Sequence, residues 1–286
     1  MHLQINQFAT YLSHVGYQSQ TQKTIISHVK EFLSREKCEA WSDCSMKQIL
    51  NFLSYLRNRP LIRKPGVLSS SMTGQYIFAL KVFLRWGELC GKLVINPFDH
   101  IKLPVRARST SHKPLSRNDI IKLFDACADY RERALLHLFY SCGLRRGEVL
   151  RLKLTDVSLK EHTVYIRNGK GKKRRLVPFT EEVGLDLAKY IGESSISRKK
   201  GSEAFMLTYS RKKMSSTTCY RIFKGIIHRS GMTARSIGFH DLRFSVATHL
   251  LEAGMPMHIV RDFLGHSCLA STHIYAKPHP SKVLEL

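Results

Sequence analysis

Apolar side chains recur every three to four positions in four stretches of the first hundred residues. This spacing places them on one face of a helix and predicts four amphipathic helices. Their apolar positions fall within residues 3–12, 25–33, 49–56 and 77–84. Ser45 stands where the third helix needs an N-cap, and Asn96-Pro97 is expected to stop the helical pattern. The N-terminal part of the chain is therefore predicted to be helical.

The pattern changes over residues 103–114, which read LPVRARSTSHKP. This stretch is basic, rich in Ser and Thr, poor in apolar residues and bracketed by Pro104 and Pro114, which is typical of a linker between domains. We therefore expect a helical domain over residues 1–102, a basic linker over 103–114 and a second domain over 115–286.

The second domain is predicted to be mostly helical with one basic hairpin. Ser116 and Asp119 form a capping-box pattern that opens a helix, and a more buried helix over 131–141 is expected to end at Gly143. Two alternating stretches, 162–167 and 174–178, are joined through Asn168-Gly169 and predict paired strands. Further helices are expected at about 180–191, 215–229, 240–253 and 256–263. The expected fold class is mainly α with a small β-hairpin or sheet: a helical N-terminal domain plus an α-rich (α+β) second domain.

The net charge identifies the class of partner. The chain has 46 Lys and Arg against 22 Asp and Glu, a formal charge of +24. Such a charge repels itself unless a polyanion lies against it. Up to Val105 there are 13 basic against 6 acidic residues, and after it 33 against 16. Both parts are positive, so we expect both to contact nucleic acid. An anionic membrane surface is the second reading, and it needs one amphipathic helix with a concentrated basic face.

Several kinds of protein are excluded by what the sequence lacks. No stretch approaches the roughly 18 apolar residues of a membrane span, so no membrane partner is expected. The seven cysteines are odd in number, scattered and never spaced CxxC, which argues against disulfides and zinc and predicts a cytoplasmic protein. The sequence has no GxxxxGK[ST], no HExxH and no acidic cluster for Mg²⁺. No metal and no cofactor are therefore expected, and a cationic site remains.

Five short motifs follow one another in the second domain: GLRRGE (143–148), GKGKKR (169–174), HDLR (240–243), LGH (264–266) and a tyrosine nine residues after His266. Taken singly, each motif is explained as well by solvated side chains. Together and in this order they resemble the tyrosine recombinase family, which includes phage integrases and Xer resolvases. The resemblance covers about residues 109–286, and the helical N-terminal domain is similar to the family's core-binding domain.

The resemblance assigns catalysis to six residues, which are Arg145, Lys170, His240, Arg243, His266 and Tyr275. It implies that Arg145 and Arg243 clamp the phosphate. The chemistry agrees, because guanidinium forks match phosphate oxygens bidentately and keep their charge. Arg146 is the competing arginine, and Glu148 is expected to orient an arginine or brace its helix.

By the same resemblance Tyr275 is the nucleophile. The alternative interpretation is that Tyr275 is a tyrosine of the hydrophobic core. His240 assists its proton transfer and His266 donates to a non-bridging oxygen. Lys170 protonates the leaving 5′ oxygen. The neighbouring Lys172 and Lys173 are instead expected to contact backbone phosphates.

Two features depart from the family pattern. Phe244 follows HDLR where the family often has histidine, which we expect to alter packing rather than chemistry. Only eleven residues follow Tyr275, with prolines at 278 and 280. Many relatives dock a longer C-terminal helix into a neighbouring subunit, and Val283–Leu286 is all that remains here for that task.

The resemblance implies a site-specific DNA recombinase that works through a covalent 3′-phosphotyrosyl intermediate and a Holliday junction without metal or ATP. Its implied partners are double-stranded DNA and a homo-tetramer on two sites, a dimer per site. An accessory DNA-binding protein or a second recombinase is a further partner that the family allows. Two rivals stay open: a monomeric type IB topoisomerase, and a DNA-binding protein that keeps the fold without catalysis.

Overall fold

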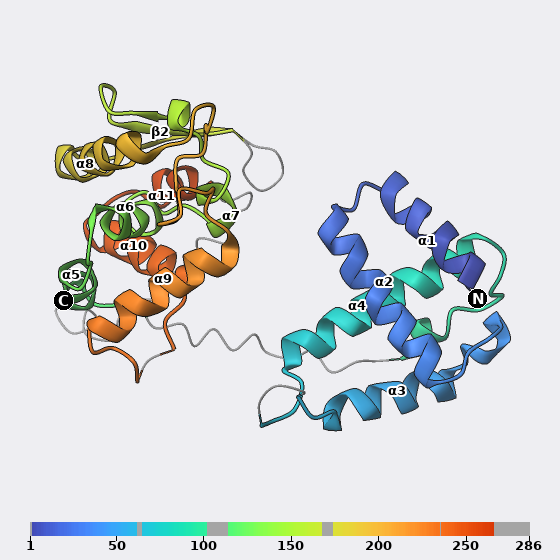
Figure 1. Ribbon diagram of the computed structural model, residues 1–286. Coiled ribbons are helices and arrows are strands. Elements are labelled where there is room, and N and C mark those ends of the chain that lie inside the picture. Colours follow the sequence, from blue (N-terminus) through green and yellow to red (C-terminus); the bar gives the residue numbers. More distant parts are fainter. Residues whose placement is uncertain (1, 62–64, 102–113, 168–173, 235, 266–286) are drawn as a thin grey trace. The chain divides into compact units, whose positions relative to one another are not determined.

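The structure is a computed structural model that describes residues 2–61, 65–101, 114–167, 174–234 and 236–265. Lys170, His266 and Tyr275 lie outside these residues. The chain divides into two compact units, Met1–Ala107 and Arg108–Leu286, each with its own hydrophobic core. Figure 1 labels the helices of each unit.

The described residues of the first unit form four α-helices. They are α1 (His2–His14), α2 (Ser19–Arg35), α3 (Met46–Asn58) and α4 (Ser70–Leu89), with short 3₁₀ turns η1 (Trp41–Asp43) and η2 (Pro97–His100). The amphipathic pattern gave all four, and their apolar faces meet in one core. One detail differs: α4 ends at Leu89, before the pair Asn96-Pro97. Asn96 instead opens η2, where its side-chain oxygen accepts a hydrogen bond from the Phe98 N–H at 3.1 Å.

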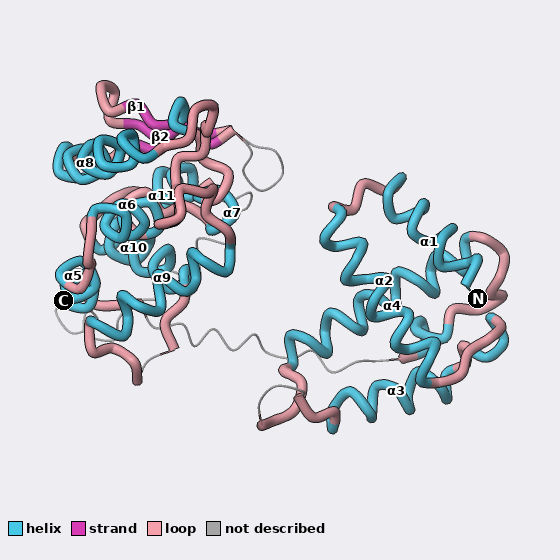
Figure 2. Tube along the Cα trace, viewed as in Figure 1, coloured by secondary structure: helices cyan, strands magenta, loops and turns pink. Residues whose placement is uncertain are grey.

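The second unit holds seven helices, one 3₁₀ turn and three strands in its described residues. The helices are α5 (Arg117–Asp125), α6 (Tyr130–Phe139), α7 (Arg146–Val149), α8 (Glu181–Ser197), α9 (Ser216–Arg229), α10 (Phe239–Glu252) and α11 (Met257–Leu264). The turn is η3 (Leu154–Asp156), and the strands are β1 (Val157–Ser158), β2 (Thr163–Ile166) and β3 (Arg175–Pro178). The strands pair antiparallel in the order β1-β2-β3, drawn in magenta in Figure 2, with Val164 opposite Val177. The predicted mainly helical fold with a small sheet is confirmed.

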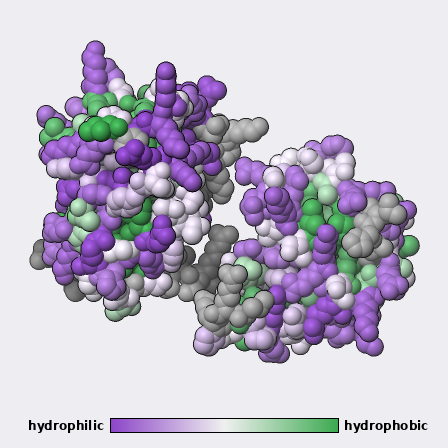
Figure 3. All heavy atoms as spheres, viewed as in Figure 1, coloured by the Kyte–Doolittle hydropathy of each residue, from purple (hydrophilic) through white to green (hydrophobic). Residues whose placement is uncertain are grey.

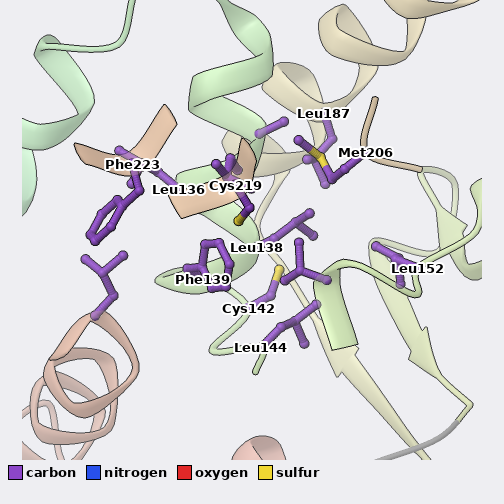
Figure 4. Close-up of a cluster of buried hydrophobic side chains, with 14 of the residues drawn as sticks. Leu136, Leu138, Phe139, Cys142, Leu144, Leu152, Leu187, Met206, Cys219 and Phe223 are labelled. Carbon is purple, nitrogen blue, oxygen red and sulfur yellow. The ribbon is translucent and has the colours of Figure 1, made fainter. Parts of the chain in front are cut away.

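Three short-range features of the second unit differ from the expectation. Strand β1 and helix α7 are additional elements; at two and four residues they are too short to show a periodic pattern. Helix α6 ends at Phe139, before Gly143. The segment between α6 and α7 is instead fixed by packing. Its Cys142 and Leu144 are buried in the core beside Leu138 and Phe139 (Figure 4).

The surface accords with the composition. On the face drawn in Figure 3, hydrophilic residues cover most of each unit, and hydrophobic residues appear as patches among them. Within the ranges that the structure describes, no helix is both long enough and apolar enough to cross a membrane.

Candidate functional site

Three arginines from three different elements converge on the last turn of α11. The carbonyl oxygens of Phe263, Leu264 and Gly265 accept hydrogen bonds from Arg175, Arg243 and Arg145, in that order. The bond from Arg175 Nε is 3.0 Å long and that from Arg145 Nη2 is 2.9 Å. The last carbonyls of a helix have no partner within it and carry its partial negative charge. The end of α11 is therefore a suitable anchor for cationic side chains.

Arg145 is held by Glu148 at the start of helix α7. It is the N-cap residue of α7, and Glu148, three residues later, accepts bonds from its backbone N–H at 2.9 Å and from Nη1 at 3.0 Å. Arg145 is 22% exposed at its side chain, so the guanidinium remains accessible at the surface of the unit. The neighbouring Arg146 is exposed. Arg145 is thus the arginine of GLRRGE that joins the cluster at α11.

Glu148 balances the charge of two arginines at once. Its carboxylate accepts two further bonds of 2.9 Å from Nη1 and Nη2 of Arg175, and the carboxylate is 2% exposed. Burial raises the pKa of Glu148, but the hydrogen bonds and charges of Arg175 and Arg145 outweigh burial and lower it to about 2. The carboxylate is therefore ionised at neutral pH. These bonds agree with the expectation that Glu148 orients an arginine.

Arg243 lies deepest in the site. The residue is 4% exposed, and its Nη1 and Nη2 donate to the carbonyls of Gly143 and Leu264. Gly143 has a φ of +57°, and a Cβ there would lie 2.7 Å from Leu264 Cδ2. Only glycine allows the α6–α7 segment to approach α11 so closely. The glycine of GLR therefore has a physical reason that the motif alone does not reveal.

His240 lies one turn before Arg243 on α10. Burial lowers the pKa of His240, and the positive charges of Arg243, Arg145 and Arg146 lower it further against a raising effect of Asp241. The imidazole is therefore neutral at pH 7 and able to accept a proton.

The structure brings together three of the six residues assigned from the sequence, Arg145, His240 and Arg243. Lys170, His266 and Tyr275 lie outside the described residues, although His266 directly follows Gly265 in the chain. Arg175 is the member that sequence reasoning missed. Its signal is the alternation of β3, which places Arg175 on the same face as the fully buried Val177. An arginine on the covered face of a strand needs a buried partner, and Glu148 supplies it.

The chemistry of the cluster is that of an anion site. Two of the three guanidinium groups, those of Arg145 and Arg175, pair with the Glu148 carboxylate, and that of Arg243 donates to the carbonyls of Gly143 and Leu264. Planar guanidinium groups bind phosphate oxygens with directed hydrogen bonds. Among the residues whose side chains the structure describes, no group of three His, Cys, Asp or Glu gathers as a metal site needs. Beside the cluster, an apolar cavity of about 810 Å³ is lined by residues of β3, α10 and α11, and Arg175 also lies on its wall.

Comparison with known proteins gives a consistent result. The profile of the phage integrase family matches residues 113–282. A tyrosine recombinase of Pseudothermotoga lettingae is 32% identical over 276 residues, which cover 95% of this chain and 92% of that protein. Tyrosine recombinase XerA of Pyrococcus horikoshii is 27% identical over 277 residues, which cover 96% of this chain and 88% of that protein.

Solved structures share the fold. The integrase of transposon Tn1549 in complex with transposon right end DNA superposes with a TM-score of 0.77 at 16% identity, covering 97% of this chain and 96% of that one. A lambda integrase dimer bound to a core site gives a TM-score of 0.73 at 18% identity, with coverage of 97% and 77%. The family profile spans more than half of the chain and agrees with the 32% identity to a full-length relative. The chain therefore belongs to the phage integrase family, the tyrosine recombinases, which are enzymes of site-specific DNA recombination.

Proposed function

We propose that this recombinase cuts and rejoins duplex DNA through a covalent 3′-phosphotyrosyl intermediate and a Holliday junction, using neither a metal ion nor ATP. The observation that carries the proposal is the convergence of Arg145 and Arg243 on adjacent carbonyls at the end of α11. A phosphodiester gains negative charge on its non-bridging oxygens as its phosphorus becomes pentavalent. Two fixed guanidinium groups stabilise that charge where another enzyme would use a metal ion.

The proton transfers are assigned to the remaining motif residues. The Tyr275 hydroxyl attacks phosphorus, forming the tyrosyl–phosphate bond while the bond to the 5′ oxygen breaks. A phenol has a pKa near 10, so it needs a proton acceptor, and neutral His240 takes that role. Lys170 gives a proton to the leaving 5′ oxygen, and His266 donates a hydrogen bond to a non-bridging oxygen. Because the phosphotyrosyl bond stores the energy of the broken bond, attack by a 5′ hydroxyl reverses the step.

The domain organisation and assembly extend the same proposal. The helical domain (1–102) and the catalytic domain (115–286) clamp DNA, joined by the linker 103–114, and the +24 charge supports contact from both. Four copies on two sites exchange one strand pair, form the junction and exchange the second pair. The solved Tn1549 integrase in complex with transposon right end DNA supports DNA as the partner, and the cysteine usage supports a cytoplasmic location.

The test is capture of the covalent intermediate. Adducts are first trapped with denaturant on fragments of the DNA that encodes and flanks the chain, which maps the site. A duplex nicked beside that site then traps the cleaved complex. The wild-type chain is expected to form a denaturant-resistant adduct, whereas Tyr275→Phe binds the same DNA and forms none. Tyr209→Phe is the matched control, because Tyr209 is 62% exposed between α8 and α9 of the same domain.

An adduct formed by Tyr275→Phe would show that another residue attacks. Incubation with DNA that carries two sites then distinguishes a recombinase from a type IB topoisomerase. A recombinase yields recombinant products, whereas a monomeric topoisomerase only relaxes the DNA.

A further inference from the structure

Arg175 has no place in the assigned catalytic set, yet it contacts Glu148 and the end of α11, the two groups that bind Arg145. Its Nη1 and Nη2 bind Glu148, its Nε binds the Phe263 carbonyl, and its side chain is 10% exposed. It comes from β3, whereas Glu148 lies on α7 and Phe263 on α11. One side chain thus joins the sheet to both elements that hold Arg145.

The bonds to Glu148 are shared evenly between the two arginines. Oε1 accepts from Nη1 of Arg145 at 3.0 Å and from Nη1 of Arg175 at 2.9 Å. Oε2 accepts from the Arg145 backbone N–H and from Nη2 of Arg175, each at 2.9 Å. The bidentate pair with Arg175 therefore fixes the plane of the carboxylate against which Arg145 is oriented.

Charge gives the second reason. A carboxylate paired with Arg145 alone would offset the positive charge that Arg145 presents to a phosphate. Arg175, whose side chain is mostly buried, balances the charge of Glu148. The positive charge of Arg145 is therefore not offset by Glu148 and can attract a phosphate. Helix α7 is a single turn of four residues, so it does little by itself to hold its N-cap side chain.

Packing at Gly265 gives the third reason. A Cβ on Gly265 would lie 2.9 Å from Arg175 Cδ, so the Arg175 stem is pressed against the residue whose carbonyl accepts from Arg145. Gly265 has a φ of +65°, which together with this close approach explains why glycine stands there. Loss of the Arg175 side chain would free both the carboxylate and the carbonyl that orient Arg145.

We propose that Arg175 is a positioning residue for DNA cleavage, which acts by fixing Glu148 and the end of α11 so that the Arg145 guanidinium meets the scissile phosphate. The proposal rests on the proposed function. It differs from a purely structural ion pair in one consequence. The need for Arg175 should disappear when the scissile phosphate carries no charge for Arg145 to stabilise.

The experiment compares two substrates in single-turnover cleavage by the full chain. One nicked duplex carries the ordinary phosphodiester, and the other carries a methylphosphonate at the scissile position, where a methyl group replaces a charged oxygen. Relative to the wild-type rate on each substrate, Arg175→Gln should be at least tenfold slower on the phosphodiester and within threefold on the methylphosphonate. Its affinity for the DNA should stay within threefold of wild type.

Arg133→Gln is the matched control, because Arg133 of α6 also pairs with a buried carboxylate, that of Asp186 on α8. It should change neither rate by more than twofold. Arg175→Lys keeps the positive charge without the bidentate fork, and it replaces Arg175→Gln if the latter shows no cooperative thermal unfolding. Equal slowing on both substrates, an unchanged rate on the phosphodiester, or failure of both variants to fold would each overturn the proposal. Absence of any adduct with the wild-type chain would instead refute the proposed function.

Discussion

Glu148 is the negative charge on which two arginines of the site depend, and Glu148→Gln tests that dependence. The substitution keeps the shape of the side chain and removes the charge that accepts four hydrogen bonds from Arg145 and Arg175. Leaving a buried charge without its partner typically destabilises a protein by about 3–5 kcal/mol. We expect a loss of that size at pH 7, confined to the second unit.

The lowered pKa gives an independent estimate and a direction in pH. A pKa of about 2 in the folded chain, against an ordinary value of 4.5, corresponds to about 3 kcal/mol of stability. Because the pKa is lower in the folded state, this contribution is fully present above pH 4.5 and is lost as the pH falls towards 2. By pH 3 about 2 kcal/mol of it should be gone. Glu148→Gln lacks the contribution at every pH, so the difference in stability between the two proteins should shrink on acidification.

The assay is urea unfolding at pH 7, 5, 4 and 3, followed by two signals. Both tryptophans of the chain, Trp41 and Trp86, lie in the core of the first unit, so their fluorescence reports that unit alone. Circular dichroism reports helices of both units. Glu148→Gln should lower the midpoint of the dichroism transition of the second unit and leave the fluorescence transition unchanged.

The control is Glu193→Gln, which removes an exposed carboxylate of α8. It should change the free energy of unfolding by less than about 0.5 kcal/mol. Equal stability of Glu148→Gln and wild type at pH 7 would contradict the charge network. An equal loss by the two proteins between pH 7 and pH 3 would show that the pKa of Glu148 is not lowered.

Two further predictions concern the DNA complex. With phosphate contacts from both domains, the plot of log K against log[salt] should have a slope of about −0.9 per neutralised phosphate, measured by fluorescence anisotropy; a nearly flat plot between about 50 and 200 mM salt would remove the clamp. Lys170→Ala should slow cleavage of ordinary DNA by about 10²–10⁴-fold, the typical contribution of a general acid. It should recover most of its rate on a 5′-bridging phosphorothiolate, whose thiolate leaves without a proton. Lys172→Ala and Lys173→Ala should lose a similar modest factor on both substrates, and rescue of Lys172→Ala alone would reassign the acid.

The local pattern of the sequence was enough for most of the architecture. Helical spacing predicted the four helices of the first unit, and two alternating stretches joined through the Asn168-Gly169 sequence predicted the pairing of β2 with β3. The contacts between Arg145 and Glu148 and the shared face of His240 and Arg243 are also local, because residues three apart lie on one face of a helix. The family motifs singled out Arg145 and Arg243, which the structure places at one helix end, and all six catalytic assignments stay predictions.

The tertiary structure alone decided how the arginines are held. Arg145 reaches a carbonyl 120 residues away, Arg243 one at 100 residues and Arg175 one at 88 residues. No periodic pattern encodes such pairs, since they depend on how α6, α10, α11 and β3 pack together. The pKa shifts have the same origin: burial and nearby arginines lower the pKa of His240, and the paired arginines lower that of Glu148 to about 2. The sequence thus supplied the chemical groups, and the long-range packing around the end of α11 gave them their orientation and charge.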